Sequence, residues 1–158
     1  MNTTRPTSKS ESVCNITCKA YEAAIKEAFP AQANEDKFMS HVILAVMESS
    51  DSYQAVRYIN DFYEWPCSRS TITLFDNIFY DIKNQVHTQI LSWVVSTGIR
   101  PNLKKGEPIT FSVNPDVHIS GHVAEVLPAT ARYAVTVPKT GTDEYVTMMA
   151  DVENVLTS

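Results

Sequence analysis

Residues 109–113 read ITFSV and residues 117–124 read VHISGHVA. In both stretches apolar and polar side chains alternate, which is the period of a half-buried β-strand. Residues 132–137 (RYAVTV) and 145–148 (YVTM) repeat the pattern, and turn-forming residues such as Asn114-Pro115-Asp116 separate the stretches. Four short strands within about 50 residues do not make a stable flat sheet by themselves. We therefore expect an antiparallel sheet that closes into a barrel or docks on the rest of the chain.

The C-terminal third also resembles small β-barrels of the SH3-like kind, such as KOW and Tudor modules. The resemblance rests on Lys105-Gly106 before the first strand and on GHVAEV at residues 121–126. It also rests on ADVENVL at residues 150–156, which is similar to the short closing turn of such barrels. The resemblance implies a closed barrel. It carries little information on function, because this fold hosts protein, peptide and nucleic-acid binders alike.

Before the sheet, apolar residues recur at helical spacing and predict four helices with short connections, as in a compact bundle. The first helix is expected over residues 12–29, and the second is expected to begin near Asn34. The third follows a cap at Asp51 or Ser52 and ends at Trp65-Pro66. The fourth spans residues 70–97 and ends at a C-terminal cap, Gly98.

The predicted fold class is α+β, an N-terminal four-helix domain followed by a small antiparallel SH3-like β-barrel. Residues 1–11 are rich in Ser, Thr, Asn, Lys and Pro without an apolar period, which is typical of a disordered arm. We expect the helical bundle to span residues 12–100 and the barrel to span residues 105–158.

The net charge of −5 is unevenly placed along the chain. Residues 1–105 contain eleven Lys and Arg against eleven Asp and Glu, whereas residues 106–158 contain two basic residues against seven acidic ones. Non-specific nucleic-acid binding depends on neutralising phosphates with Lys and Arg. An acidic barrel is better suited to a protein partner with a basic face.

The longest apolar run, residues 42–47, is far too short to span a membrane, and the start of the chain does not resemble a secretory signal. We therefore expect a cytoplasmic protein. Because disulfides are rare in that compartment, its three cysteines are expected to be reduced.

His118 and His122 are the residues that most invite a metal site. Residues four apart on a strand are separated by about 13 Å, whereas zinc ligands each lie about 2 Å from the ion. Cys14 and Cys18 could share one helix face, but no further Cys or His follows at zinc-finger spacing. We therefore expect no metal and no cofactor. The sequence shows neither a nucleophile motif nor a phosphate loop, so we expect no catalytic residues and no enzyme.

Ser68-Arg69-Ser70-Thr71-Ile72 is similar to the opening of a helix-turn-helix recognition helix. The match is partial, because Pro66 stands where that motif usually has its turn glycine. The helix that follows is also long and strongly apolar, so its face is needed for the core. The simpler interpretation is that Ser68 or Ser70 caps this helix.

These observations favour a non-enzymatic protein-binding or accessory module, such as an inhibitor, adaptor or assembly factor, whose build resembles accessory proteins of phages and mobile elements. Its expected contact surface is the outward face of the barrel with nearby acidic residues: His118, Ser120, His122, Glu125, Arg132, Asp143, Glu144 and Tyr145. One alternative is a nucleic-acid-binding protein that uses the cations Arg69, Lys83, Arg100, Lys104 and Lys105. Another is a structural protein that self-associates through Trp65, Trp93 and neighbouring aromatic residues.

Overall fold

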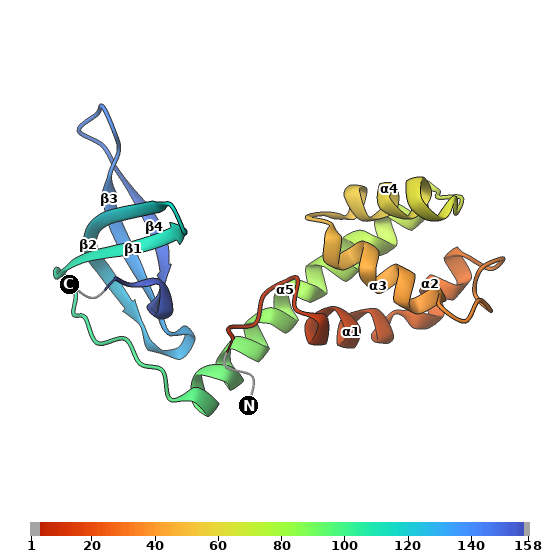
Figure 1. Ribbon diagram of the computed structural model, residues 1–158, viewed down its shortest axis with the longest axis horizontal. Helices are drawn as coiled ribbons and strands as arrows, with labels where there is room; N and C mark the ends of the chain where they lie inside the picture. The colour runs from red at the N-terminus through yellow and green to blue at the C-terminus, as the bar shows by residue number, and fades with distance from the viewer. Residues whose placement is uncertain (1–3, 157–158) are drawn as a thin grey trace. The chain divides into compact units, whose positions relative to one another are not determined.

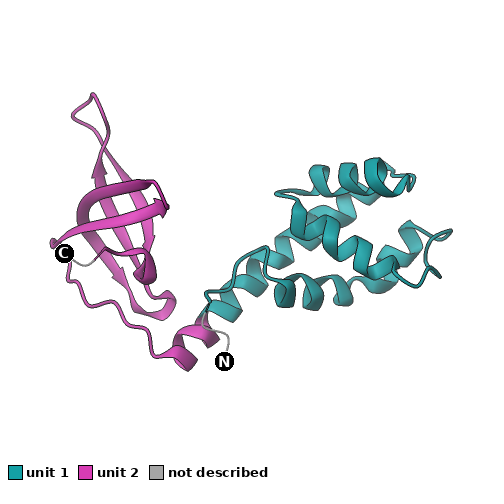
Figure 2. Cartoon of the chain, in the orientation of Figure 1, with its two compact units in different colours: residues 1–90 teal, residues 91–158 magenta. Residues whose placement is uncertain are grey.

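The computed structural model describes residues 4–156 and is α+β, as the sequence predicts (Figure 1). The chain divides into two compact units, residues 1–90 and residues 91–158 (Figure 2). This division falls earlier than the boundary expected after residue 100. Within the described residues there are five α-helices: α1 (Glu11–Ala20), α2 (Glu22–Ala28), α3 (Phe38–Glu48), α4 (Ser52–Tyr63) and α5 (Arg69–Thr97). None of the helices in residues 4–156 combines the length and the apolar character that crossing a membrane requires.

The first predicted helix is split in two at Tyr21, so the expected count of four helices was wrong. The backbone of Tyr21 leaves the helical region, with φ −100° and ψ 6°. Its hydroxyl donates a hydrogen bond to Asp81 Oδ2 of α5 at 2.7 Å, which holds the ring against that helix. The same bond raises the pKa of Tyr21, because the neutral phenol is the donor. Apolar spacing alone does not encode such a break.

The caps of the later helices follow the residues that the sequence offers. At the start of α4, Asp51 Oδ1 accepts a hydrogen bond from the Gln54 N–H at 2.9 Å. At the start of α5, Ser68 and Thr71 each accept a hydrogen bond from the other's backbone N–H, at 3.3 and 3.1 Å. Gly98 follows α5 with φ 69°, the left-handed conformation of a glycine C-cap. These caps confirm the predicted ends of both helices.

α3 begins at Phe38 and not near Asn34, which corrects the predicted start. The Glu35 N–H donates to the Gln32 carbonyl at 2.9 Å, and the Phe38 N–H donates to the Glu35 carbonyl at 3.0 Å. The chain therefore passes through successive four-residue β-turns before the helix starts.

The core of the unit formed by residues 1–90 draws on all five helices. Its fully buried side chains include Ile25, Val42, Ile59 and Phe75. The connection between α4 and α5 contributes Trp65, which is 4% exposed and packs into the same core. A residue predicted only to end a helix is therefore part of the packing.

Residues 1–3 of the expected disordered arm lie outside the described residues. In the rest of the arm, the Ser10 N–H donates to the Thr7 carbonyl at 3.0 Å, and Arg5 is buried. Cys14 Sγ donates to the Ser8 carbonyl at 3.2 Å, which ties the arm to α1. The described part of the arm therefore has contacts of its own, and the disorder expected for residues 1–11 stays a prediction.

Cys14 and Cys18 are buried on α1, and their thiols are expected to be unreactive in the folded chain. Burial raises the pKa of both thiols, that of Cys18 to about 12. The thiolate is the reacting species, and such a thiol is ionised at pH 8 to only about one part in ten thousand. We expect Ellman's reagent at pH 8 to leave Cys18 unlabelled until urea unfolds the chain. Equal labelling rates with and without urea would show that α1 does not protect it.

Residues 91–158 contain a four-stranded antiparallel sheet in the order β1-β2-β3-β4. Its strands are β1 (Pro108–Asn114), β2 (Val117–Leu127), β3 (Arg132–Pro138) and β4 (Tyr145–Asp151). In the described part of the chain β1 and β4 share no ladder, so the sheet is not closed into the expected barrel. After β4 the chain turns through η2 (Val152–Asn154), and a single bridge then joins Val155 to Phe111 of β1. Where a closed barrel would have a strand paired along β1, the structure has this one bridge. The wider resemblance to SH3-like modules stays a prediction.

The sheet has its own small core, formed by inward side chains from all four strands. Its buried members are Ile109, Phe111, Val123, Tyr133, Val135, Val137 and Ala150. The register shifts between Val123 and Glu125, which marks a bulge in β2. Beyond this bulge the alternation of β2 is displaced by one residue.

Candidate protein-binding face

Alternate residues of the four strands form one face of the sheet, called the outer face below. The register pairs Thr110 with Ser120, His122 with Thr136, and Thr136 with Thr147. Directly paired residues point to the same side of a sheet, so these side chains share one face. The outer face includes Thr110, Ser112, His118, Ser120, His122, Thr136, Tyr145, Thr147 and Met149.

Three of the predicted contact residues, His118, Ser120 and His122, lie at successive outward positions of β2 and are exposed. The hydroxyls of Ser120 and Thr110 are 2.8 Å apart and hydrogen-bonded. Both imidazoles stand on the solvent side of the sheet, where they can donate or accept hydrogen bonds from a partner. Within residues 4–156 no group of three His, Cys, Asp or Glu lies close enough together to hold a metal ion.

β4 contributes the largest apolar side chains of the outer face. Tyr145 is 68% exposed and Met149 is 50% exposed, with Thr147 between them on the same side. Tyrosine and methionine are enriched in protein interfaces, since the ring offers a large contact area and the thioether adapts its shape. Strand phase identified Tyr145. It missed Met149 because the predicted strand ended at Met148.

Of the charged residues predicted for the site, Glu125 and Arg132 lie on the outer face, because Glu125 pairs with Ala134 opposite Met149 and Arg132 pairs with Asp151. Two of the predicted charged residues have ionic partners within the sheet. Glu144 accepts from Lys139 Nζ at 3.0 Å across the β3–β4 hairpin. Arg132 and Asp151 form a half-buried salt bridge at 2.5 Å between β3 and β4. Arg132 therefore stabilises the pairing of these strands and is poorly placed for a partner. The remaining two predicted residues are exposed: Glu125 and Asp143.

The five cations of the nucleic-acid alternative are not gathered on one element. Arg69 and Lys83 are exposed on α5, in the unit of residues 1–90. Roughly 21 Å of helix separates them, at 1.5 Å per residue. The other three lie in the segment between α5 and β1, in the second unit: Arg100, Lys104 and Lys105. Ser68, which would open a recognition helix, is the cap of α5.

The self-association alternative named two tryptophans that the structure buries. Trp65 is 4% exposed and Trp93 is 6% exposed. Both indoles therefore present little surface to a second copy of the folded chain. Large apolar side chains that are exposed in residues 1–90 instead include Tyr53, Phe62 and Tyr80.

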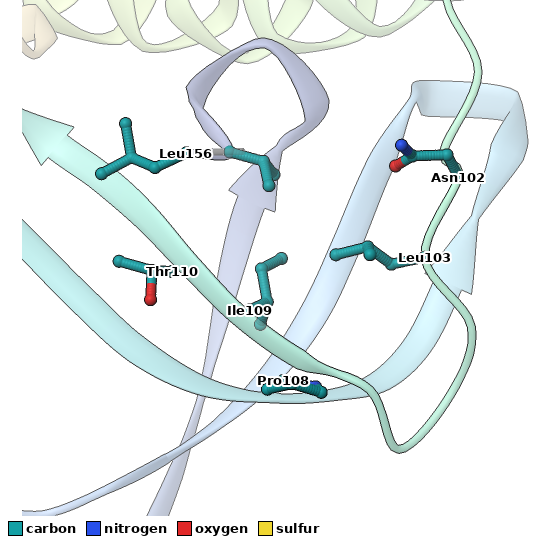
Figure 3. Close-up of a pocket in the computed structure, with 7 residues that line it drawn as sticks. Asn102, Leu103, Pro108, Ile109, Thr110 and Leu156 are labelled. Atoms are coloured by element: carbon teal, nitrogen blue, oxygen red, sulfur yellow. The ribbon is translucent and has the colours of Figure 1, made fainter. Parts of the chain in front are cut away.

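A groove of about 380 Å³ lies beside β1, at a place where the sequence predicts no site (Figure 3). Leu103 and Ile109 point toward one another there, and Leu156 contributes to the lining. The buried Tyr133 holds one rim, because its hydroxyl accepts hydrogen bonds from the N–H groups of Asn102 at 2.8 Å and Leu103 at 3.0 Å. The lining comes from stretches that are far apart in sequence, so no local pattern could have revealed it.

No family model, curated protein or solved structure matches the chain. A proposal about its function therefore has to start from the chemistry of the surface itself. That face combines hydrogen-bonding side chains on β1 and β2 with exposed apolar ones on β4. Such a surface can bind a complementary protein surface through hydrogen bonds and apolar contact.

Proposed function

We propose that this chain is a non-enzymatic protein-binding module, an accessory protein that inhibits, recruits or assembles a partner protein. The proposal rests on the outer face, where Tyr145 and Met149 are exposed on the same side of the sheet as His118, Ser120 and His122. Interfaces gain most of their affinity from a few such aromatic anchors, surrounded by polar groups that hydrogen-bond at the rim.

The partner of this face is expected to be basic. Residues 106–158 contain seven acidic side chains against two basic ones. Of the two basic residues, Arg132 is paired with Asp151 and Lys139 with Glu144. The remaining acidic side chains attract a positively charged surface, which raises the association rate and favours one class of partner.

The test is an affinity capture from native lysate with three versions of the full chain: wild type, Tyr145→Ala and Tyr53→Ala. Tyr53 is the matched control because its side chain, 64% exposed on α4, is nearly as accessible as that of Tyr145. We expect Tyr145→Ala to weaken capture of a specific protein by about thirtyfold, the effect of losing an interface anchor worth about 2 kcal/mol. Tyr53→Ala should capture that protein as wild type does.

Each lysate is divided, and one half is treated with nuclease. A protein captured from both halves and lost with Tyr145→Ala supports the proposal. Capture that disappears with nuclease would move the function to nucleic acid and to the cations of the alternative interpretation. Equal capture by all three versions would show that the outer face is not the interface.

A further inference from the structure

β4 is an edge strand with a free side. The strand order ends at β4, and among the described residues β3 is its partner in the sheet. Its seven residues pair with β3 without interruption, from Tyr145 opposite Pro138 to Asp151 opposite Arg132. The opposite side of β4 therefore presents backbone groups that could pair with another strand.

The hydrogen bonds that flank β4 show which of its residues face the free side. The Lys139 N–H donates to the Glu144 carbonyl at 2.9 Å, and the Val152 N–H donates to the Ala131 carbonyl at 3.1 Å. In an antiparallel ladder the bonded pairs recur at every second residue. Even-numbered residues of β4 are therefore bonded to β3. Tyr145, Thr147 and Met149 direct their N–H and carbonyl groups outward.

This edge lacks the features that usually prevent strand addition. Residues 145–150 contain no proline, no charged side chain and no bulge relative to β3. Three apolar side chains on the strand are also exposed: Tyr145 (68%), Val146 (41%) and Met149 (50%). Main-chain pairing would thus be accompanied by apolar contact on both faces of the added strand.

The charges on and beside β4 indicate which kind of strand could pair with its free edge. Residues 139–153, which contain β4 and its flanks, have four acidic side chains and one basic side chain, Lys139. A second copy is disfavoured, because antiparallel pairing centred on Met148 would place Asp143 of each copy opposite Glu153 of the other. Like charges directly opposite each other destabilise a sheet, whereas basic residues at these positions would stabilise it.

We propose that the free edge of β4 binds an extended, basic segment of a partner protein by strand addition, with main-chain hydrogen bonds to Tyr145, Thr147 and Met149. This inference rests on the proposed protein-binding function and names its mode. The added segment alternates apolar and polar side chains, since its neighbours on β4 alternate between the two faces of the sheet. Lysine or arginine lies near each end of the segment, close to the acidic flanks of β4.

The experiment screens a library of random twelve-residue displayed peptides against the full chain and measures the affinity of the enriched peptides for three variants. Thr147→Pro removes an outward N–H while keeping the bonds to β3, which is the position that an edge strand tolerates for proline. Thr147→Ala keeps the N–H and changes the side chain alone. Asp143→Lys reverses a charge in the exposed hairpin loop without touching the strand.

We expect the enriched peptides to be basic and alternating. Their affinity should fall about tenfold or more with Thr147→Pro, which loses a hydrogen bond and adds a ring to the edge. It should fall about twofold to fivefold with Asp143→Lys, and by no more than about twofold with Thr147→Ala, which loses a side-chain contact but keeps the outward N–H. Equal binding by Thr147→Pro, or enrichment of acidic or non-alternating peptides or of none, would overturn the proposal.

Amide hydrogen exchange, measured on the same samples, shows directly which backbone N–H groups of β4 are hydrogen-bonded. In the free chain the amides of Val146, Met148 and Ala150 should exchange slowly and those of Tyr145, Thr147 and Met149 rapidly. Bound peptide should slow the second group. Slow exchange at the first group in Thr147→Pro shows that this variant is folded. Should it unfold, Asp143→Lys and the exchange pattern of the wild type decide the question.

The two proposals can fail separately. If lysate capture depends on Tyr145 but survives Thr147→Pro, the chain binds a protein through the outer face and strand addition is wrong. If no protein is captured at all, the proposed function is wrong, whatever the peptide screen returns. A concentration-dependent dimer that Thr147→Pro abolishes would show that a second copy, and not a basic partner, occupies the edge.

Discussion

Replacing Gly121 with valine is expected to destabilise the sheet unit by more than about 3 kcal/mol. Gly121 lies on β2 opposite Ile109. A Cβ atom at this position would lie 2.4 Å from the carbonyl oxygen of Thr136 and 2.8 Å from Val135 Cγ1. Because that oxygen belongs to the backbone of β3, no side-chain rotation relieves the contact, and β2 and β3 must separate. Alanine adds only the Cβ and is expected to cost about 1–3 kcal/mol.

The measurement is urea unfolding of the full chain, followed through the NMR methyl signals of Val123 and Val135, which report on the sheet core. Ser120→Ala is the control, since it changes the neighbouring exposed residue of the same strand. We expect it to lower the free energy of unfolding by no more than about 1 kcal/mol, the effect of losing the exposed hydrogen bond to Thr110. A wild-type midpoint for Gly121→Val would mean that β2 does not approach β3 as closely as the structure shows.

The role of Gly121 illustrates what a sequence pattern can and cannot predict in the sheet. Alternation located the four strands, because the period of two reflects a local property, burial of every second side chain. The close approach of β2 to β3 depends on the local geometry of two strands that are apart in the sequence, and nothing near Gly121 encodes it. For the same reason, the bulge after Val123 was not predicted.

The candidate sites show the same difference between features set by one strand and features set by how distant strands are arranged. Strand phase predicted the exposure of His118, Ser120, His122 and Tyr145, since each exposure follows from the alternation of a single strand. The free edge of β4 and the groove beside β1 depend on strand order and on which distant segments meet. Periodicity carries no information on either. The expected barrel was wrong for this reason, because closure requires β1 and β4 to be neighbours.

In the helical unit, features that depend on neighbouring residues were again predicted better than features that depend on distant ones. Asp51, Ser68 and Gly98 cap helices as predicted, because a cap is an interaction between residues three or four apart. The break occurs at Tyr21, whose hydroxyl donates to Asp81 sixty residues away, and no local pattern in the sequence indicates that contact.

The second large effect is expected at Trp65, a residue whose sequence context predicted only the end of a helix. Its indole lies among four rings of the helical unit. The ring centroids of Phe38, Phe29 and Tyr63 lie 5.2, 5.3 and 5.4 Å from it, and that of His41 lies 6.0 Å away. With 4% of its surface exposed, Trp65 fills the space that α2, α3 and the end of α4 leave between them. Truncating it would leave a cavity bordered by these rings, and such cavities lower stability in proportion to their volume.

We therefore expect Trp65→Ala to lower the free energy of unfolding of the helical unit by about 3–5 kcal/mol. Trp65→Phe keeps a ring among the other four and should lose about half of that, since stacked and edge-to-face contacts each contribute about 0.5–1.5 kcal/mol beyond burial. Urea unfolding followed by circular dichroism at 222 nm measures both, with Tyr53→Ala as the exposed aromatic control. If Trp65→Ala and Tyr53→Ala lowered stability equally, Trp65 would be a surface residue, and self-association through its indole would again be a reasonable hypothesis.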